Sequence, residues 1–267
     1  YRLNLEIKKC RERRNIFIDL AARLEMEVKP FQLLPDESAR NVGSLIRERL
    51  GVLDTDFNTL KFEDTYAYWK NIIERDGVLV YESQYIPDKS GVIGAAMFYD
   101  TYPIILIKRG GNFNERKLFT LLHEYAHLLL GKSAINDAGA QVVRRDDPSV
   151  DGLEARCNAL AGEILIPAEK IDLSVYTGLA AADKMELLSR TFKVTYTTAA
   201  VCLRKLQLIS NTEFIHLLDL RRKANETKSQ SKGEGARIPR ENLMRLDMGR
   251  PMFKTVLEAY SVGLLDI

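Results

Sequence analysis

The chain has 267 residues, of which 46% are hydrophobic and 28% charged, with a formal net charge of +2. This composition is typical of a globular protein with one large or two small domains, and it does not favour a nucleic-acid surface over the whole chain. No apolar run reaches the ~18 residues of a membrane-spanning helix and no secretory signal is visible, so we expect no membrane contact. The three cysteines are far apart and form no C-x-x-C pair. We therefore expect a cytoplasmic protein without a disulfide framework or a cysteine zinc site.

Two helices are predicted in the first fifty residues. Residues 1–29 are highly charged, and their apolar positions mix helical with strand-like spacing. A second helix, over 37–50, is expected to stop at Gly51. Nothing in this part looks catalytic, so we expect a role in support, in dimerisation or as a helical connector. The chain starts at Tyr1 rather than Met, and we therefore expect it to be part of a longer protein.

A small sheet is predicted next. A helix over 62–75 leads into a strand pattern over 77–83, and two further strand-rich runs, 91–99 and 103–108, are joined by a short turn. Runs of this kind around a short turn predict a β-hairpin. We therefore expect a mostly antiparallel sheet.

The segment His123-Glu124-Tyr125-Ala126-His127 is an H-E-x-x-H pattern that uses two of the chain's three histidines. On a helix, positions i and i+4 lie on one face, so both imidazoles can bind one divalent ion while Glu124 acts beside it as a general base. The surrounding run 118–130 is apolar at nine positions, so the helix is predicted to be largely buried. A bound metal removes the free-energy cost of burying its polar stripe. The alternative is a pair of core histidines with a chance glutamate.

Flanking residues delimit this helix. Asn112 with Glu115 three residues later resembles a capping box, and Gly131 is a natural C-terminal stop. The following stretch, 132–150, is polar and irregular, and we expect a lid, a binding element or a disordered segment there. The next helix is predicted over 151–166.

The third metal ligand is expected downstream, because catalytic zinc usually has three protein ligands and a water. Leu130 and Ser133 stand where a metzincin would need Gly and His, which excludes that class. The remaining histidine, His216, lies in an apolar run and is interpreted as a core or interface residue. A carboxylate is left, and Glu154 is the best candidate. Asn158, one turn further on, could accept the free ring N–H of a ligating histidine.

From the residues alone, two roles stay open for Glu154. It is either the ligand or the partner of Asp151 in a capping box. Small residues make this helix thin and allow close approach to the metal helix. Glu163, nine positions on, lies about half a turn round the helix and is not expected to share the site.

Two motifs resemble the ImmA/IrrE family of metallopeptidases. The stretch 119–131, Phe-Thr-Leu-Leu-His-Glu-Tyr-Ala-His-Leu-Leu-Leu-Gly, closely resembles the metal helix of that family. The stretch 154–167, which contains a glutamate, an asparagine and a terminal Leu-Ile-Pro, is similar to its second motif. Cys157 stands where the family more often has alanine. The resemblance spans roughly residues 40–210 and implies an α+β, zincin-like domain with a small sheet packed on a metal-binding helix pair.

The resemblance also implies a site and a reaction. One Zn²⁺ per chain is implied, with Mn²⁺ as an alternative. The implied metal ligands are His123, His127 and Glu154. Glu124 is the implied general base, and Asn158 is expected to support the ligands from behind. The reaction is metal-assisted hydrolysis of a peptide bond. A substrate segment is expected to lie extended along the edge offered by 91–99.

Members of the family are soluble bacterial or phage-borne proteases, often linked to or fused behind a helix-turn-helix domain, and several cleave a repressor. The resemblance therefore implies a protein substrate, a helix-turn-helix transcriptional repressor, in stress or mobile-element regulation. The opening helices resemble the connector of the fused type. A DNA-binding module is then expected either to have been removed or to lie upstream of Tyr1.

A second function is left open by residues 185–206. They resemble a helix-turn-helix, with Lys193 where the turn usually prefers glycine. The alternative is an αα-hairpin packed on the protease, and the basic residues on its expected face are modest for DNA binding. On this reading the chain is a transcriptional regulator or binding module with a structural or vestigial metal site. DNA contact would then run through this segment or through the upstream domain.

The predicted organisation has five parts. They are a helical connector over 1–55, a zincin-like peptidase domain over 56–170, a helix-turn-helix-like subdomain over 171–220, a flexible linker over 221–240 and a helical segment over 241–267.

Overall fold

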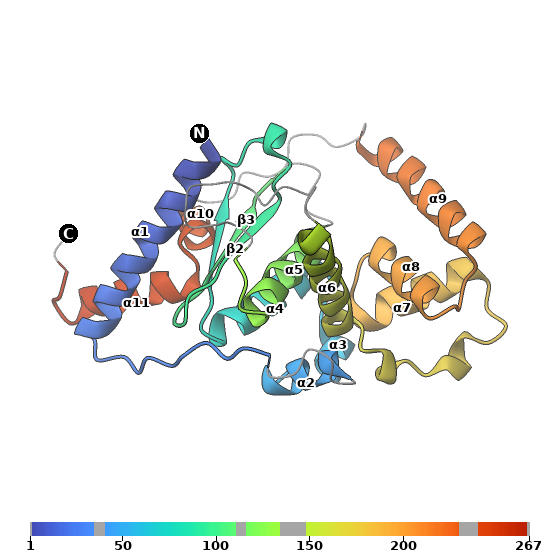
Figure 1. The fold of residues 1–267 in the computed structure, drawn as a ribbon, viewed down its shortest axis with the longest axis horizontal. Helices are drawn as coiled ribbons and strands as arrows, with labels where there is room; N and C mark the ends of the chain where they lie inside the picture. The colour runs from blue at the N-terminus through green and yellow to red at the C-terminus, as the bar shows by residue number, and fades with distance from the viewer. Residues whose placement is uncertain (1, 35–40, 111–115, 134–147, 230–239, 266–267) are drawn as a thin grey trace. The chain divides into compact units, whose positions relative to one another are not determined.

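A computed structural model gives the fold of the chain (Figure 1). The structure describes residues 2–34, 41–110, 116–133, 148–229 and 240–265. The chain divides into two compact units. Residues 1–39, 66–161 and 239–267 form one, which we call the sheet unit, and residues 40–65 and 162–238 form the other, the helical unit.

The sheet unit is built on one mixed sheet. Its strands β1 (Leu79–Ser83), β2 (Gly94–Met97) and β3 (Ile104–Lys108) lie in the order β1-β3-β2. The predicted hairpin is confirmed, since β2 is antiparallel to β3, with Gly94 opposite Ile107. The expectation of a mostly antiparallel sheet is wrong in detail, because β1 pairs with β3 in parallel. Alternation of apolar residues predicts a strand but does not say which edge the strand joins.

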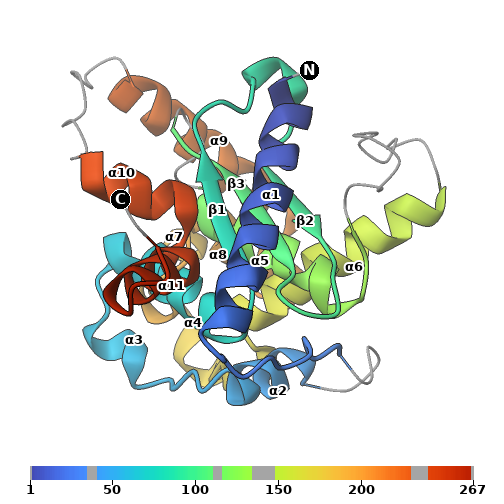
Figure 2. The same ribbon diagram turned by 90° about the vertical axis from the view of Figure 1, so that its left-hand side faces the viewer.

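One face of this sheet is covered by helices from both ends of the chain. Helix α1 (Arg2–Arg23) lies across this face of the sheet (Figure 2), and α10 (Arg240–Met248) and α11 (Arg250–Ser261) belong to the same unit. Buried apolar residues of α1, α11, the three strands and the loop after β1 form one cluster: Leu3, Ile7, Cys10, Phe17, Ala21, Leu79, Tyr81, Ile86, Ala95, Met97, Ile104, Leu106 and Met252. The strand-like alternation near the N-terminus is not used, because Leu5 is exposed. The N-terminal helix is therefore part of this core, whereas the sequence suggested a separate connector.

The opposite face is covered by α4 (Thr65–Arg75) and α5 (Lys117–Leu129). Glu82 of β1 points to this face, where its carboxylate pairs with Lys70 of α4 at 3.0 Å and with Lys117 of α5 at 2.5 Å. Charged groups that are fully buried are usually paired in this way. The network ties both helices to the sheet.

The helical unit is formed by α-helices and short 3-10 helices. Its helices are α2 (Val42–Arg49), α3 (Asp56–Thr59), the C-terminal end of α6 (Pro148–Leu165), α7 (Ala181–Phe192), α8 (Tyr196–Lys205) and α9 (Asn211–Ser229). Short 3-10 helices lie at Phe62–Asp64, Ala168–Lys170 and Leu173–Tyr176, and a further one, Asp88–Ser90, lies in the sheet unit. The buried Arg47 donates to the carbonyl oxygens of Ile164 and Leu165 and so caps the end of α6.

Parts of the chain outside the sheet also bear on what the sequence predicts. Helix α9 continues to Ser229, so the first part of the expected linker over 221–240 is helical. His216 is exposed on α9, so it is not a core residue, and its interpretation as an interface residue stays a prediction. The capping pair Asn112 and Glu115, and most of the irregular stretch 132–150, lie outside the described residues. Among the helices that are described, none is long and apolar enough to cross a membrane.

Candidate metal centre

Helix α5 ends where the sequence predicts, in a way that fixes its last turn. Gly131 has a φ of 64°, in the left-handed region that glycine adopts at low cost. The backbone N–H of Gly131 donates to Leu128 O at 2.9 Å, and that of Lys132 donates to His127 O at 2.9 Å. This pair of bonds is a Schellman motif. It holds in place the turn that carries His127.

The polar side chains of α5 lie on one stripe of an otherwise buried helix. Leu121, Leu122 and Tyr125 are fully buried on its other sides. His127 is 1% exposed and Glu124 is 5% exposed, so both are removed from water. Polar groups in such surroundings need partners, because an unpaired one costs free energy.

Helix α6 supplies the third side chain. It begins at Pro148, so the backbone of Asp151 is already helical and cannot be the N-cap. The capping-box alternative for Glu154 is therefore wrong. Glu154 and Asn158 are one turn apart on this helix and both reach the histidines of α5.

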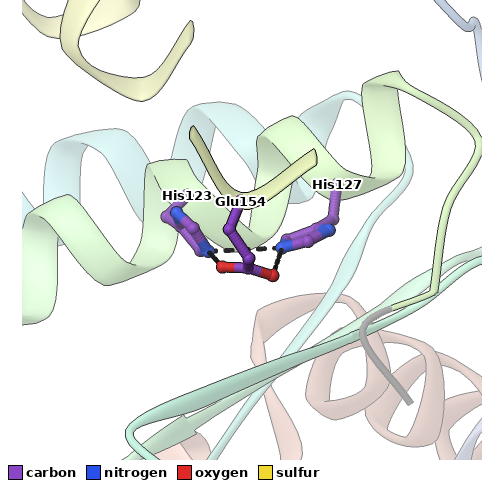
Figure 3. Close-up of side chains that lie close together, drawn as sticks. All are labelled: His123, His127 and Glu154. Carbon is purple, nitrogen blue, oxygen red and sulfur yellow. Dashed lines mark hydrogen bonds and ion pairs between the residues drawn. The ribbon is translucent and has the colours of Figure 1, made fainter. Parts of the chain in front are cut away.

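The three candidate ligands converge (Figure 3). His123 Nε2 lies 3.2 Å from His127 Nε2. Glu154 lies between them, with Oε2 3.2 Å from His123 Nε2 and Oε1 3.2 Å from His127 Nε2. One ligand atom from each residue falls within 4.8 Å of the others. Behind this group, His123 Nδ1 lies 3.0 Å from Asn158 Oδ1.

The segment that contains this group matches a known family. A family model described as the IrrE N-terminal-like domain, a peptidase family, matches residues 77–204. This range includes strands β1 to β3, helix α5 and the whole of α6. Residues 77–204 form an ImmA/IrrE-family metallopeptidase domain. No curated protein matches the chain.

The donor set in the ImmA/IrrE domain suits a divalent metal ion. Two imidazole nitrogens and a carboxylate are the ligands of catalytic zinc in one group of peptidases. Burial, and then the charge of His123, lower the pKa of His127 to about 4, so its ring is neutral at pH 7. A neutral ring is the form that binds a metal. With Nδ1 of His123 donating to Asn158, Nε2 of that ring carries its lone pair toward the other ligands.

Glu124 sits in an environment that favours its protonated form. Burial, followed by the negative charge of Glu154, raises the pKa of Glu124 to about 8, and a hydrogen bond from the backbone N–H of Ala96 acts in the opposite direction. Its Oε2 is buried and has no hydrogen-bond partner among the described residues. A perturbed carboxyl beside a group of metal-type ligands is typical of an acid or base in catalysis.

Two other polar residues of α5 and α6 lie outside this group. Tyr125 donates its hydroxyl to Asp76 Oδ2 at 2.6 Å and is buried, so it is committed to the core of the sheet unit. Glu163 pairs with Lys205 at 3.2 Å within the helical unit. Neither is one of the three converging residues.

Sequence reasoning missed two contacts of strand β2. Gly94 lies directly against Glu124, and the backbone N–H of Phe98 donates to Ser133 Oγ at 2.9 Å. A glycine inside a strand pattern is a known sign of close approach and could have indicated the first. The contact between Phe98 and Ser133 joins residues far apart in the sequence, and no local sequence pattern predicts it.

Proposed function

We propose that the chain is a zinc-dependent endopeptidase in which His123, His127 and Glu154 hold one Zn²⁺ and Glu124 is the general base. The observation that carries the proposal is the convergence of these side chains from two helices within an ImmA/IrrE-family metallopeptidase domain. Mn²⁺ is an alternative ion, because the same nitrogen and oxygen donors bind it.

The metal, when bound, lowers the pKa of its water toward ~7 and polarises the scissile carbonyl group. Glu124 takes the proton of the attacking water and later delivers it to the leaving amine nitrogen. Its Oε2 is the carboxylate atom without another hydrogen bond in the described part of the chain. Asn158 keeps the ring of His123 in one tautomer and one orientation.

The substrate is expected to lie along β2, because β2 is an edge strand of the sheet. Lys108 N donates to Ile93 O, so in the antiparallel pattern Ala96 and Phe98 point their backbone groups away from β3, toward the free edge. The N–H of Ala96 interacts with Glu124, and that of Phe98 with Ser133. A peptide that pairs here therefore relies on the strand's carbonyl oxygens as acceptors.

We further propose that the substrate is a helix-turn-helix transcriptional repressor and that cleavage takes place in the cytoplasm. This rests on kinship with the ImmA/IrrE family. Co-expression of the chain with a repressor encoded beside it or fused to it, followed by mapping of any new protein termini, identifies the cleaved bond.

The role of each residue is tested with two variants. Glu124→Gln is expected to retain the metal and abolish cleavage, because it removes the base but no ligand. His123→Ala is expected to lose metal and cleavage together. Normal cleavage by Glu124→Gln would show that the base is assigned wrongly.

One observation favours a second function, DNA binding by α7 and α8. They form a helical hairpin whose turn residue Lys193 is left-handed, with a φ of 52°, as in a helix-turn-helix. Three of its basic side chains are already engaged, since Arg190 pairs with Glu186, Lys205 with Glu163, and Arg204 stacks on Phe214. DNA binding by the full chain that weakens with added salt supports this function, and no binding at low salt rejects it.

A further inference from the structure

Strand β2 passes so close to α5 that Gly94 has no room for a side chain. A Cβ atom at Gly94 would lie 2.6 Å from Thr120 Cγ2, 2.7 Å from Glu124 Oε1 and 2.8 Å from Glu124 Cγ. Real Cβ atoms do not approach other atoms this closely. The φ of Gly94 is not positive, so the glycine is required for space and not for its backbone conformation.

The next residue on the same side of β2 also contacts Glu124. Residues i and i+2 of a strand point their backbone groups to the same edge, and the backbone N–H of Ala96, which faces the free edge of β2, hydrogen-bonds the Glu124 carboxylate. Gly94 and Ala96 together form a cradle for this carboxylate. One oxygen lies against the strand, while Oε2 has no hydrogen-bond partner among the described residues.

We propose that Gly94 is a positioning residue for Glu124, whose carboxylate can reach the Ala96 amide only because position 94 has no side chain. The direction from which Glu124 takes a proton is then set by strand β2. The proposal rests on the proposed peptidase function, because only there does Glu124 transfer a proton. The atoms nearest to an added Cβ belong to Thr120 and Glu124 and not to the metal ligands.

A packing role is the alternative, since the same Cβ would also meet Thr120. Thr120→Ser removes Cγ2 and with it this contact, but leaves both contacts to Glu124 unchanged. The double variant Gly94→Ala/Thr120→Ser therefore separates the two roles. It also keeps the test valid if Gly94→Ala alone folds poorly.

The test uses the full chain, with and without added zinc. The variants are Gly94→Ala, Thr120→Ser, their double variant and Glu124→Gln, with Gly162→Ala as the matched control because nothing lies within 4 Å of a Cβ there. The first readout is the NMR resonance of the Ala96 amide and its hydrogen exchange, which requires neither metal nor substrate. The second is bound zinc, and the third is kcat and KM for cleavage.

The expected results distinguish positioning from packing. The double variant and Glu124→Gln both shift the Ala96 amide proton upfield and speed its exchange, because the hydrogen bond to the side chain at position 124 is lengthened or lost. Bound zinc stays at the wild-type level. The kcat of the double variant falls about 100-fold or more with KM unchanged, as expected for a misplaced general base. Thr120→Ser and Gly162→Ala alter neither the Ala96 resonance nor kcat.

Three results overturn the proposal. They are an Ala96 resonance that does not respond to Glu124→Gln, an Ala96 resonance that stays at its wild-type position in the double variant, and a wild-type kcat in the double variant. A wild-type chain that cleaves nothing rejects the proposed function instead. The amide resonance then still decides whether Gly94 sets the position of Glu124.

Discussion

The ring of His123 is oriented by a single side chain of α6. His123 Nδ1 lies 3.0 Å from Asn158 Oδ1, and an amide oxygen can only accept, so Nδ1 carries the proton. Nε2 is then the nitrogen that faces His127 and Glu154. Support of this kind fixes the tautomer of a metal-binding histidine and the direction of its lone pair.

We predict that Asn158→Ala lowers zinc affinity by about 10- to 100-fold, because this acceptor is lost while all three ligands remain. Competition titration of the purified protein against a zinc chelator measures the change. Asn158→Asp keeps an acceptor oxygen and serves as the control, with affinity near that of the wild type. Equal affinities for Asn158→Ala and the wild type would show that the hydrogen bond to His123 does not support metal binding.

The sequence predicts the two histidine ligands better than it predicts the roles of Glu154 and Gly94. His123 and His127 follow from helical spacing alone, because positions i and i+4 share a face in any helix. The role of Glu154 stays open until the first turn of α6 is located, because the capping alternative requires Asp151 to precede the helix. A glycine inside a strand pattern indicates a close approach at Gly94, but no local rule identifies Glu124 as the neighbour, because this contact joins a strand to a helix.

At the scale of secondary-structure elements, the buried carboxylate of Glu82 links strand β1 to helices α4 and α5. Glu82 of β1 accepts hydrogen bonds from Lys70 of α4, Lys117 of α5 and the Tyr66 hydroxyl of α4. Its side chain is fully buried. Burial lowers the pKa of Lys117 even beside Glu82, so this ammonium depends on the carboxylate to remain charged.

We predict that Glu82→Ala lowers the free energy of unfolding by about 3–5 kcal/mol, because it leaves two buried ammonium groups without their partner. Urea unfolding with EDTA present, so that metal does not contribute, measures the loss. Asp219→Ala is the matched control: its salt bridge with Arg222 is half exposed, and its loss is expected to change stability by about 0.5 kcal/mol or less. A comparable effect of the two substitutions would mean that the Glu82 network is not a stabilising contact.

The same carboxylate predicts a pH dependence. Burial raises the pKa of Glu82, but Lys70 and Lys117 together outweigh it and hold the pKa below the ordinary value of 4.5. The unfolded chain therefore binds this proton more readily, so the stabilisation is complete above about pH 4.5 and is lost as the pH falls through the folded pKa. Urea unfolding at a series of pH values checks this. The difference in stability between wild type and Glu82→Gln is expected to shrink toward low pH, and a constant difference contradicts it.

The sequence predicts strands and helices where the local pattern is strong. The β2–β3 hairpin and the end of α5 are confirmed, because a short turn and Gly131 act through neighbouring residues. No local pattern predicts the parallel pairing of β1 with β3, because this pairing depends on where the chain returns to the sheet. The same holds for α1, whose place in the core is set by contacts with β1, β3 and α11 and not by its own sequence.

At the scale of the whole molecule, fluorescence can follow the sheet unit separately from the helical unit. The chain has one tryptophan, Trp69, which is fully buried in the sheet unit. All three candidate ligands belong to the same unit. Tryptophan fluorescence therefore reports on the unit in which the metal is proposed to bind.

We predict that zinc raises the thermal midpoint followed by Trp69 fluorescence, because a ligand that binds only the folded state stabilises it by about 2.7 kcal/mol at 100 times its Kd. Glu154→Ala is expected to remove this response while leaving the fluorescence of the folded protein unchanged. The measurement is a thermal scan at several zinc concentrations. A midpoint that rises equally in wild type and Glu154→Ala would place the zinc elsewhere.

The proposal of a zinc peptidase is tested most directly by metal content and cleavage measured on the same protein samples. Elemental analysis is expected to find about one zinc per chain in the wild type and in Glu124→Gln, and little in Glu154→Ala, as a three-ligand site requires. Among these samples only the wild type is expected to cleave the co-expressed repressor. A Glu154→Ala variant that keeps its zinc, or a Glu124→Gln variant that cleaves as well as the wild type, would contradict the assignment of this site.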